Sequence, residues 1–224
     1  MERSVLRHEL KYYISPGGAA IIKSRLSRLM RPDPHADGFT PYFIRSLYFD
    51  DMEISAYRDK ISGVAERTKY RVRFYNMDPS FISFEKKEKK GEYILKTSQR
   101  IDLPTARIMA EGKPTGADKG LLREYDILLK NRFLKPLVVV DYDRTVFAYP
   151  IGDVRITLDE NVRGRRFSGE LFDTAASFPA LDRGETVLEV KYDAVLPPQI
   201  ECLLADIPKN RSAVSKYCLC CAAL

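Results

Sequence analysis

The sequence predicts an α+β protein in which eight strands form a closed, mainly antiparallel β-barrel with helices packed outside. Eight segments alternate polar and apolar residues with the period of a strand, and most are joined directly or through short helical segments. Charged side chains gather on one face of several of these strands, which favours closure around a lined bore wide enough for one small ligand. With 45% hydrophobic residues and no low-complexity linker, we expect a single domain over residues 1–224.

The expected elements follow one another along the whole chain. Strands are predicted over residues 5–14, 42–50, 66–76, 81–90, 92–101, 136–149, 153–163 and 185–192. Ser15 and Pro16 precede apolar residues at helical spacing, which predicts a helix to about Met30. Further helices are expected over residues 53–61, 104–111, 118–133 and 198–206, and from residue 212 onward. Residues 31–41 and 164–184 carry the residue types of irregular segments.

Composition excludes several classes of protein. The 37 Lys and Arg residues exceed the 31 Asp and Glu residues by only six, so the chain is mildly basic. No apolar run approaches the ~20 residues of a membrane helix, and the N-terminus lacks a signal-peptide core. We therefore expect a cytoplasmic chain that does not insert into a membrane. Four cysteines, three of them at positions 218, 220 and 221, predict reduced thiols on a terminal helix rather than a disulfide framework or a zinc site.

A row of cations marks one face of the strand expected over residues 66–76. Its alternate positions hold Arg67, Lys69, Arg71 and Arg73, whereas Tyr70, Val72 and Phe74 point the other way. Same-face neighbours lie about 6.6 to 7 Å apart, so these cations repel one another unless an anion lies between them. The planar guanidinium group is also well suited to phosphate. A solvated charged face remains the alternative for any single residue.

Carboxylates occur at matching positions on other strands. Glu9 with Lys11, and Glu189 with Lys191, form two Glu-x-Lys pairs whose side chains share a face, and Glu85 and Asp159 are further candidates. Such oxygen ligands suit Mg²⁺ or Mn²⁺ bound to phosphate. Without a metal, each carboxylate would act as a counter-ion for neighbouring Arg and Lys residues.

Eight short motifs, in order, are similar to those of one family. They are Arg7-His8-Glu9-Leu10-Lys11-Tyr12, Ser46-Leu47-Tyr48-Phe49-Asp50, Lys69-Tyr70-Arg71-Val72-Arg73, Glu85-Lys86-Lys87, Asp143-Arg144, Arg155-Ile156-Thr157-Leu158-Asp159, Glu189-Val190-Lys191-Tyr192 and Ser215-Lys216-Tyr217. Together they resemble the VTC (vacuolar transporter chaperone) polyphosphate polymerase domain of the triphosphate tunnel metalloenzymes, the CYTH-like superfamily. The resemblance covers nearly the whole chain.

The resemblance implies a metal-dependent phosphotransferase that moves the γ-phosphoryl group of ATP to a growing inorganic polyphosphate chain inside a cationic tunnel. The catalytic, phosphate-gripping residues would be Lys11, Arg71, Arg73, Lys87, Arg144, Arg155 and Lys191. Glu189 would hold the divalent metal, Mn²⁺ or Mg²⁺. Further phosphate or nucleotide contacts would come from Glu9, Tyr48, Lys69, Glu85, Ser215 and Lys216.

Other functions remain open at this stage. The wider superfamily's hydrolases carry Glu-x-Glu-x-Lys on the first strand, whereas Arg7 replaces the first Glu here, which disfavours a tripolyphosphatase or nucleoside triphosphatase without excluding it. A non-catalytic polyphosphate- or nucleotide-binding module is the other alternative. Nucleic-acid binding is disfavoured because Tyr70 and Phe74 lie opposite the arginine row. Whether Lys69, Lys89, Lys96 and Arg100 face the tunnel or the surface stays undecided. A separate membrane partner also stays open.

Overall fold

The computed structural model describes residues 8–34, 36–91, 93–173, 179–180 and 184–223. These residues group into two compact units, each assembled from three stretches of the chain. Unit 1 comprises Met1–Phe43, Tyr142–Val162 and Asp182–Val214, and unit 2 comprises Ile44–Asp141, Arg163–Leu181 and Ser215–Leu224. Three long strands, β3 (Tyr42–Asp50), β7 (Lys135–Tyr149) and β8 (Val154–Arg166), contribute residues to both units.

The strands form one mostly antiparallel sheet of ten strands rather than a closed barrel of eight. Hydrogen-bonded neighbours run in the order β10-β1-β9-β8-β7-β3-β4-β5-β6, with β2 paired to β7. Within the described residues, no pairing joins the two ends of this path, so the prediction of a closed barrel was wrong. Alternation along a strand specifies which face each side chain occupies, but closure depends on strand tilt and on the pairing of two edge strands.

All eight predicted strands are present, and the two additional ones are short. β1 (His8–Ile14), β4 (Glu66–Tyr75), β5 (Asp78–Lys90), β6 (Tyr93–Ile101) and β9 (Thr186–Tyr192) lie close to their expected limits. The extra strands β2 (Arg31–Pro32) and β10 (Asn210–Arg211) span two residues each. Segments this short carry no periodic pattern, so alternation could not predict them. Residues 5–7 of the first predicted strand lie outside the described part.

The expected helices are also present. They are α1 (Pro16–Leu26), α2 (Ser55–Ile61), α3 (Leu103–Ala110), α4 (Gly120–Arg132), α5 (Pro198–Leu204) and α6 (Lys216–Ala222), with a short 3₁₀ turn at Ile151–Asp153. Ser15 caps α1 by accepting a hydrogen bond from the Gly18 amide at 3.1 Å. The helix ends before Met30 because the amides of Arg28 and Leu29 bond three residues back, in 3₁₀ fashion.

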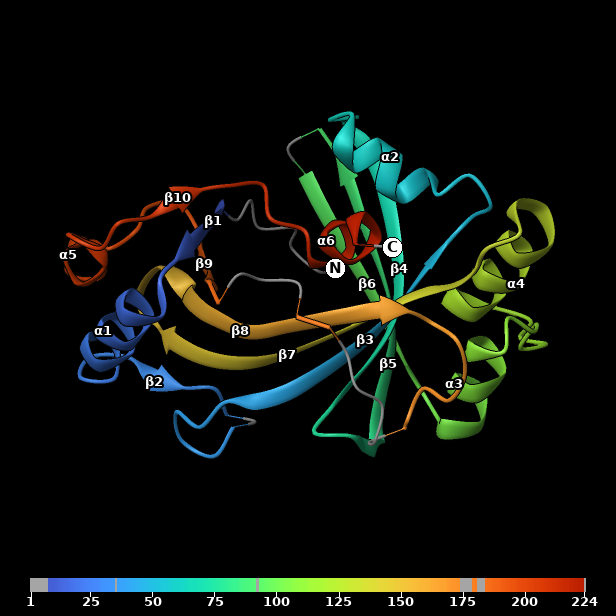
Figure 1. Ribbon diagram of the computed structural model, residues 1–224, viewed down its shortest axis with the longest axis horizontal. Helices are drawn as coiled ribbons and strands as arrows, with labels where there is room; N and C mark the ends of the chain where they lie inside the picture. The colour runs from blue at the N-terminus through green and yellow to red at the C-terminus, as the bar shows by residue number, and fades with distance from the viewer. Residues whose placement is uncertain (1–7, 35, 92, 174–178, 181–183, 224) are drawn as a thin grey trace. The chain divides into compact units, whose positions relative to one another are not determined.

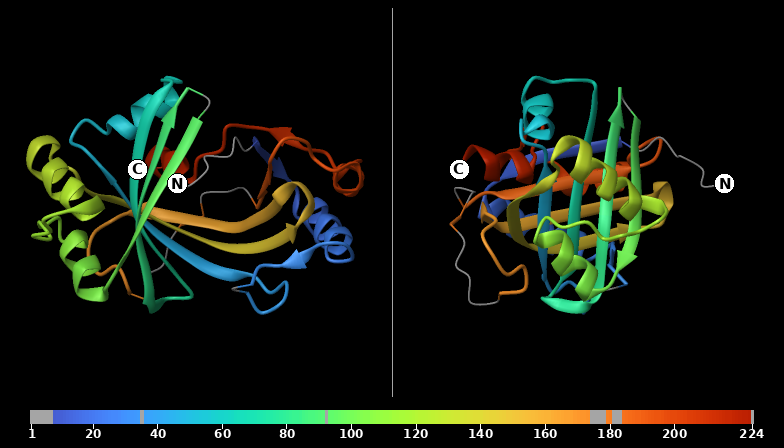
Figure 2. Two further views of the ribbon diagram at one scale, coloured as in Figure 1. Left: turned by 180° about the vertical axis from the view of Figure 1, so that it is seen from behind. Right: turned by 90° about the vertical axis from the view of Figure 1, so that its right-hand side faces the viewer.

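Unit 2 packs its core on one face of β4, β5 and β6. α3 and α4 cover this face, as the right-hand view of Figure 2 shows. Phe49, Phe84 and Tyr125 meet edge to face there, with ring centroids 5.6 to 6.1 Å apart. Tyr70, Val72 and Phe74, the predicted apolar positions of β4, belong to this same core. The alternate positions of β4 therefore face the opposite side of the sheet.

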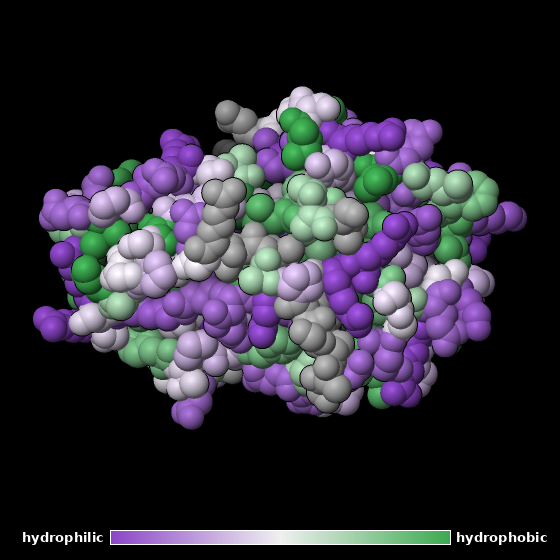
Figure 3. Space-filling view, viewed as in Figure 1, coloured by the Kyte–Doolittle hydropathy of each residue, from purple (hydrophilic) through white to green (hydrophobic). Residues whose placement is uncertain are grey.

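Unit 1 has its own core, in which α1 and α5 contact each other (Figure 1). Ile22 and Leu26 of α1 pack with Ile156 and Leu158 of β8 and with Val190 of β9. The polar faces of β1, β8 and β9 are thereby directed away from these helices. On the face of the molecule shown in Figure 3, hydrophobic residues are scattered among hydrophilic ones. No helix in the described ranges has the length and hydropathy needed to cross a membrane.

Candidate phosphate-binding site

The register of β4, β5 and β6 in unit 2 places nine side-chain positions on the face opposite α3 and α4. Lys87 pairs with Lys69 on one side and with Lys96 on the other, so three lysines lie directly across adjacent strands. We call these nine positions the cationic grid. They are Lys69, Arg71, Arg73, Ser83, Glu85, Lys87, Lys96, Ser98 and Arg100. Six of these side chains are cations and only one is a carboxylate, so the cations repel one another. This repulsion would be relieved by a bound polyanion.

Glu85 is the carboxylate at the centre of the cationic grid. Its Oε2 accepts hydrogen bonds from Arg71 Nε at 2.7 Å and NH2 at 2.6 Å, and its Oε1 lies 2.8 Å from Lys96 Nζ. The residue is only 3% exposed. Although burial alone would raise the pKa of this carboxyl, Arg71, Arg73 and Lys96 hold it well below its usual range. Glu85 is thus ionised at physiological pH and keeps two cations in place.

Tyr48 of β3 extends the row of Arg71 and Glu85 by one strand. The register pairs Tyr48 with Arg71 and Ser46 with Arg73. Arg71 NH1 donates to the Tyr48 hydroxyl at 3.1 Å, and Arg73 Nε donates to Ser46 Oγ at 3.0 Å. Burial raises the pKa of Tyr48, but Arg71, Arg73 and Lys69 outweigh it and lower the value to about 8. Arg73 is only 6% exposed, so it is buried as well as charged.

The C-terminal helix α6 of unit 2 contacts Lys69, at one corner of the cationic grid. Lys69 Nζ donates to Ser215 Oγ at 3.0 Å and lies 4.9 Å from the centroid of the Tyr217 ring. Tyr217 in turn donates its hydroxyl hydrogen to the carboxylate of Asp50, at the end of β3. Asp50 also accepts hydrogen bonds from backbone amides of α2, so it joins α6 to the strand that carries Tyr48.

A second charged group lies in unit 1, on the strands β1 and β9. Its two lysines and two glutamates alternate, because the register pairs Glu9 with Lys191 and Lys11 with Glu189. Lys11 Nζ is 2.6 Å from Glu9 and 3.7 Å from Glu189, and Lys191 Nζ is 2.5 Å from Glu189. Burial alone would raise the pKa of Glu189, but Lys11, Lys191 and Arg144 keep it well below its usual range.

The two remaining predicted arginines of unit 1, Arg144 and Arg155, each form an ion pair with an aspartate. Arg144 binds Asp159 through two parallel hydrogen bonds of 2.6 and 2.7 Å, and Asp159 is fully buried. Arg155, which pairs with Lys191 across β8 and β9, donates to Asp33 at 2.7 Å. These two arginines are therefore oriented by acidic partners.

The donor chemistry of unit 1 fits a divalent cation that binds together with phosphate. Glu9 and Glu189 are brought together on one ammonium group, and Mg²⁺ or Mn²⁺ at such sites takes one or two carboxylates plus substrate oxygens and water. Among the described residues, no group of three or more His, Cys, Asp or Glu side chains is arranged to hold a metal. Glu189 and Glu9 could hold such an ion only if substrate and water complete its ligands.

The predicted site residues thus divide between the two units. Unit 2 brings together Tyr48, Lys69, Arg71, Arg73, Glu85, Lys87 and Ser215 and also contains Lys216, and unit 1 holds Glu9, Lys11, Arg144, Arg155, Glu189 and Lys191. The structure assigns the undecided Lys69 and Lys96 to the cationic grid through their contacts with Ser215 and Glu85. Arg7 lies outside the described residues.

Sequence reasoning left Lys96 undecided and overlooked Asp33 and Ser46. Lys96 could have been placed by counting outward along both strands from the turn at Gly91, because Lys90 pairs with Tyr93 and the register then follows. Asp33 lies in a stretch expected to be irregular, and its contact with Arg155 joins residues 122 positions apart. No sequence signal identifies such a contact.

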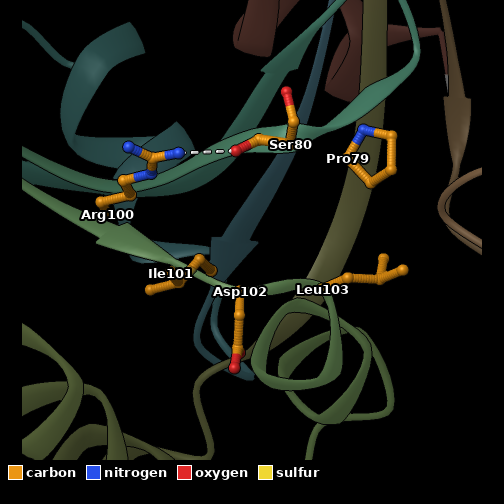
Figure 4. Close-up of a pocket in the computed structure, with 6 residues that line it drawn as sticks. All are labelled: Pro79, Ser80, Arg100, Ile101, Asp102 and Leu103. Atoms are coloured by element: carbon orange, nitrogen blue, oxygen red, sulfur yellow. Dashed lines mark hydrogen bonds between the residues drawn. The ribbon is translucent and has the colours of Figure 1, made fainter.

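A hollow of about 400 Å³ lies where β5 begins and β6 ends (Figure 4). Arg100 reaches over it and donates to the Ser80 carbonyl at 2.8 Å, and Asp102 caps α3 at its margin. Its other lining residues are Pro79, Ile101 and Leu103. The hollow is lined by one cation and one carboxylate, whereas the rest of the cationic grid has five cations and one carboxylate.

The sheet, its covering helices and the clustered charges define an α+β protein with a row of cations on one face of its sheet. A family model described as "VTC domain" matches residues 6–224, so the chain belongs to the VTC domain family. No curated protein matches the sequence.

Solved structures of similar shape come from bacteria and archaea. A protein from Bacillus halodurans described as a candidate adenylate cyclase has 15% identity and a TM-score of 0.49, over 89% of this chain and 84% of that one. The PH1819 protein from Pyrococcus horikoshii has 15% identity and a TM-score of 0.45, over 92% and 94%.

Proposed function

We propose that this chain is a metal-dependent polyphosphate polymerase that transfers the γ-phosphoryl group of ATP to the end of an inorganic polyphosphate chain. The observation that carries the proposal is the cationic grid, in which Lys69, Lys87 and Lys96 lie directly opposite one another across three strands. A linear phosphate chain supplies an anion at each unit of its length, and so relieves repulsion along a whole row of cations. Membership of the VTC domain family supports the same substrate class.

The cationic grid would bind the outer phosphates and orient them for in-line transfer. Phosphoryl transfer requires positioning and charge stabilisation rather than covalent chemistry from the protein. Arg71 is fixed by Glu85 and Tyr48, and Arg73 by Ser46, so both guanidinium groups are oriented before substrate arrives. Preorganised donors of this kind stabilise developing charge at little cost in reorganisation. Ser215 and Lys216 would add contacts from α6.

In unit 1, Lys11, Arg144, Arg155 and Lys191 would contact phosphate oxygens, and Glu189 with Glu9 would hold Mn²⁺ or Mg²⁺. When bound, the metal would offset negative charge on the phosphates. The acceptor is a terminal phosphate, which is already anionic at neutral pH. The reaction therefore requires no dedicated general base from the protein.

Chain-length analysis tests the proposal directly. The purified protein is incubated with ATP and Mn²⁺, with and without a short polyphosphate primer, and the products are separated by length while orthophosphate is measured in parallel. We expect the primer to lengthen. Release of orthophosphate alone would identify a hydrolase, and persistence of both ATP and primer would identify a binding module; either result overturns the polymerase.

A matched pair of variants links the activity to the cationic grid. Lys96→Gln removes a cation whose side chain is half exposed, so the fold should tolerate it, and we expect kcat/KM for polyphosphate to fall about tenfold. Lys130→Gln makes the same change at an exposed position of α4, the helix that covers the opposite face of the sheet, and should leave the rate unaltered. Equal rates for the two variants would contradict the assignment of the grid.

A further inference from the structure

Ser215 and Lys69 form a hydroxyl–amine pair at the corner of the cationic grid. Lys69 Nζ lies 3.0 Å from Ser215 Oγ, and the backbone amide of Cys218 donates to the same oxygen at 3.4 Å. These two contacts hold the hydroxyl group at the N-terminal cap of α6, on the side facing β4. Ser215 is half-buried, and its oxygen contacts a lysine of the cationic grid directly.

The environment of Lys69 favours its neutral amine more than that of a surface lysine does. Burial lowers the pKa of Lys69 and Arg67 lowers it further, whereas Cys218 and Tyr48 act in the opposite direction. The neighbour across the strand is another lysine, Lys87. An amine beside a hydroxyl group can accept the proton of that hydroxyl, which is how a serine becomes a nucleophile in Ser-Lys pairs.

We propose that Ser215 accepts a phosphoryl group from ATP and becomes phosphoserine. The inference rests on the proposed function in one respect, that ATP binds with its γ-phosphate at the cationic grid. A bond forms between Ser215 Oγ and the γ-phosphorus, and the bond from that phosphorus to the β,γ-bridging oxygen breaks. Its electron pair leaves with ADP, and the hydroxyl proton passes to Lys69 Nζ, which takes part as the neutral amine and becomes an ammonium cation in the same step.

The phosphorylated side chain would have counter-ions in place. Lys69 already contacts Ser215, and Lys87 faces Lys69 from β5. A phosphoserine carries about −1.5 to −2 charges at neutral pH and forms charge-assisted hydrogen bonds with such cations. Its terminal oxygens would resemble the end of a phosphate chain bound at the same corner. The modified serine would then serve as the first acceptor when no free primer is present.

Labelling of the whole chain tests this inference. The protein is incubated with Mn²⁺ and ATP radiolabelled in the γ-phosphate, without primer, and is then denatured and washed. We expect covalent label that survives acid and is removed by alkali, as phosphoserine is, and that mass spectrometry places on Ser215. Acid-labile label would indicate phosphorylated lysine at Lys69 instead and would overturn the proposal.

Variants provide the controls. Ser215→Ala should lose the label and Ser215→Thr should retain part of it, whereas Ser212→Ala, an exposed serine nearby, should be labelled like the wild type. Primed synthesis by the wild-type protein is measured in the same samples. Chain growth without label on Ser215 would overturn this inference and leave the polymerase standing; absence of both ATP consumption and label would overturn both.

Discussion

Arg71 and Glu85 face each other on β4 and β5, and the guanidinium group contacts a single carboxylate oxygen through Nε at 2.7 Å and NH2 at 2.6 Å. The second oxygen of Glu85 is 2.8 Å from Lys96. One buried anion therefore holds two cations of the grid in place. Any ligand on this face must compete with Glu85 for them or bind alongside it.

Replacing Glu85 with Gln should destabilise the ligand-free protein by about 1 to 3 kcal/mol, because Arg71 and the half-exposed Lys96 lose their buried carboxylate partner. The same change should strengthen binding of tripolyphosphate, since the competing anion is gone. Denaturant unfolding with and without tripolyphosphate measures both effects, and the ligand should restore more stability to the variant than to the wild type. Glu88→Gln, which alters a carboxylate bound to Lys86, is the matched control. An equal gain from ligand in wild type and Glu85→Gln would contradict this account.

Tyr48 should make ligand binding sensitive to pH. Its pKa is lowered to about 8, because Arg71, Arg73 and Lys69 outweigh the effect of burial. Above this pH the phenolate neutralises part of the cationic grid, so the affinity for tripolyphosphate should fall in the wild type and stay flatter in Tyr48→Phe. Calorimetric titration with tripolyphosphate, at pH values below and above the pKa of Tyr48, measures this affinity. Tyr75→Phe, on the same face of β4 as Arg71 and Arg73, is the control variant.

The lowered pKa of Tyr48 should also make the free energy of unfolding depend on pH. The folded protein releases the Tyr48 proton at a lower pH than the unfolded chain, whose tyrosine pKa is about 10. The unfolded state therefore binds more protons between about pH 8 and 10, and stability should rise over that interval. Unfolding free energies of wild type and Tyr48→Phe that change in parallel across it would refute the lowered pKa.

Glu189→Gln should weaken Mn²⁺ binding in the presence of tripolyphosphate by at least about tenfold, the effect typical of losing a metal-supporting group. The change removes an oxygen ligand and also leaves Lys11 and Lys191 without one of their carboxylate partners. Electron paramagnetic resonance of free Mn²⁺ measures binding without turnover. Glu160→Gln removes a carboxylate that contacts Lys23 of α1, and this variant should bind Mn²⁺ with the same affinity as the wild type. Matching affinities for all three proteins would exclude Glu189 as a ligand.

Tyr217→Phe should loosen α6. The change removes the hydrogen bond to Asp50 from a nearly fully buried side chain, which typically costs about 1 to 2 kcal/mol. Amide hydrogen exchange should accelerate in residues 216–222 and remain unchanged in α3. Tyr57→Phe, within α2, controls for the loss of a tyrosine hydroxyl group elsewhere in unit 2. Uniform acceleration throughout unit 2 would show general destabilisation instead of release of α6.

The strand pattern was largely predictable because side-chain alternation is local. Alternation on β4 predicted that Tyr70 and Phe74 are core residues and that Arg71 and Arg73 lie on the other face, and both points are confirmed. It also predicted that Glu9 and Lys11 share a face. It could not predict that Arg73 is buried, because exposure depends on what neighbouring strands and helices cover.

The sequence by itself determined the identities, faces and approximate limits of eight strands and six helices, since periodicity, caps and turns are properties of neighbouring residues. The tertiary structure decided that the ten-stranded sheet is open among the described residues, where a closed barrel was expected. It also decided that Lys87 lies between Lys69 and Lys96, and that Ser215 meets Lys69 across 146 positions. Strand register and long-range contacts arise from cooperative packing of the whole chain, which no local pattern encodes.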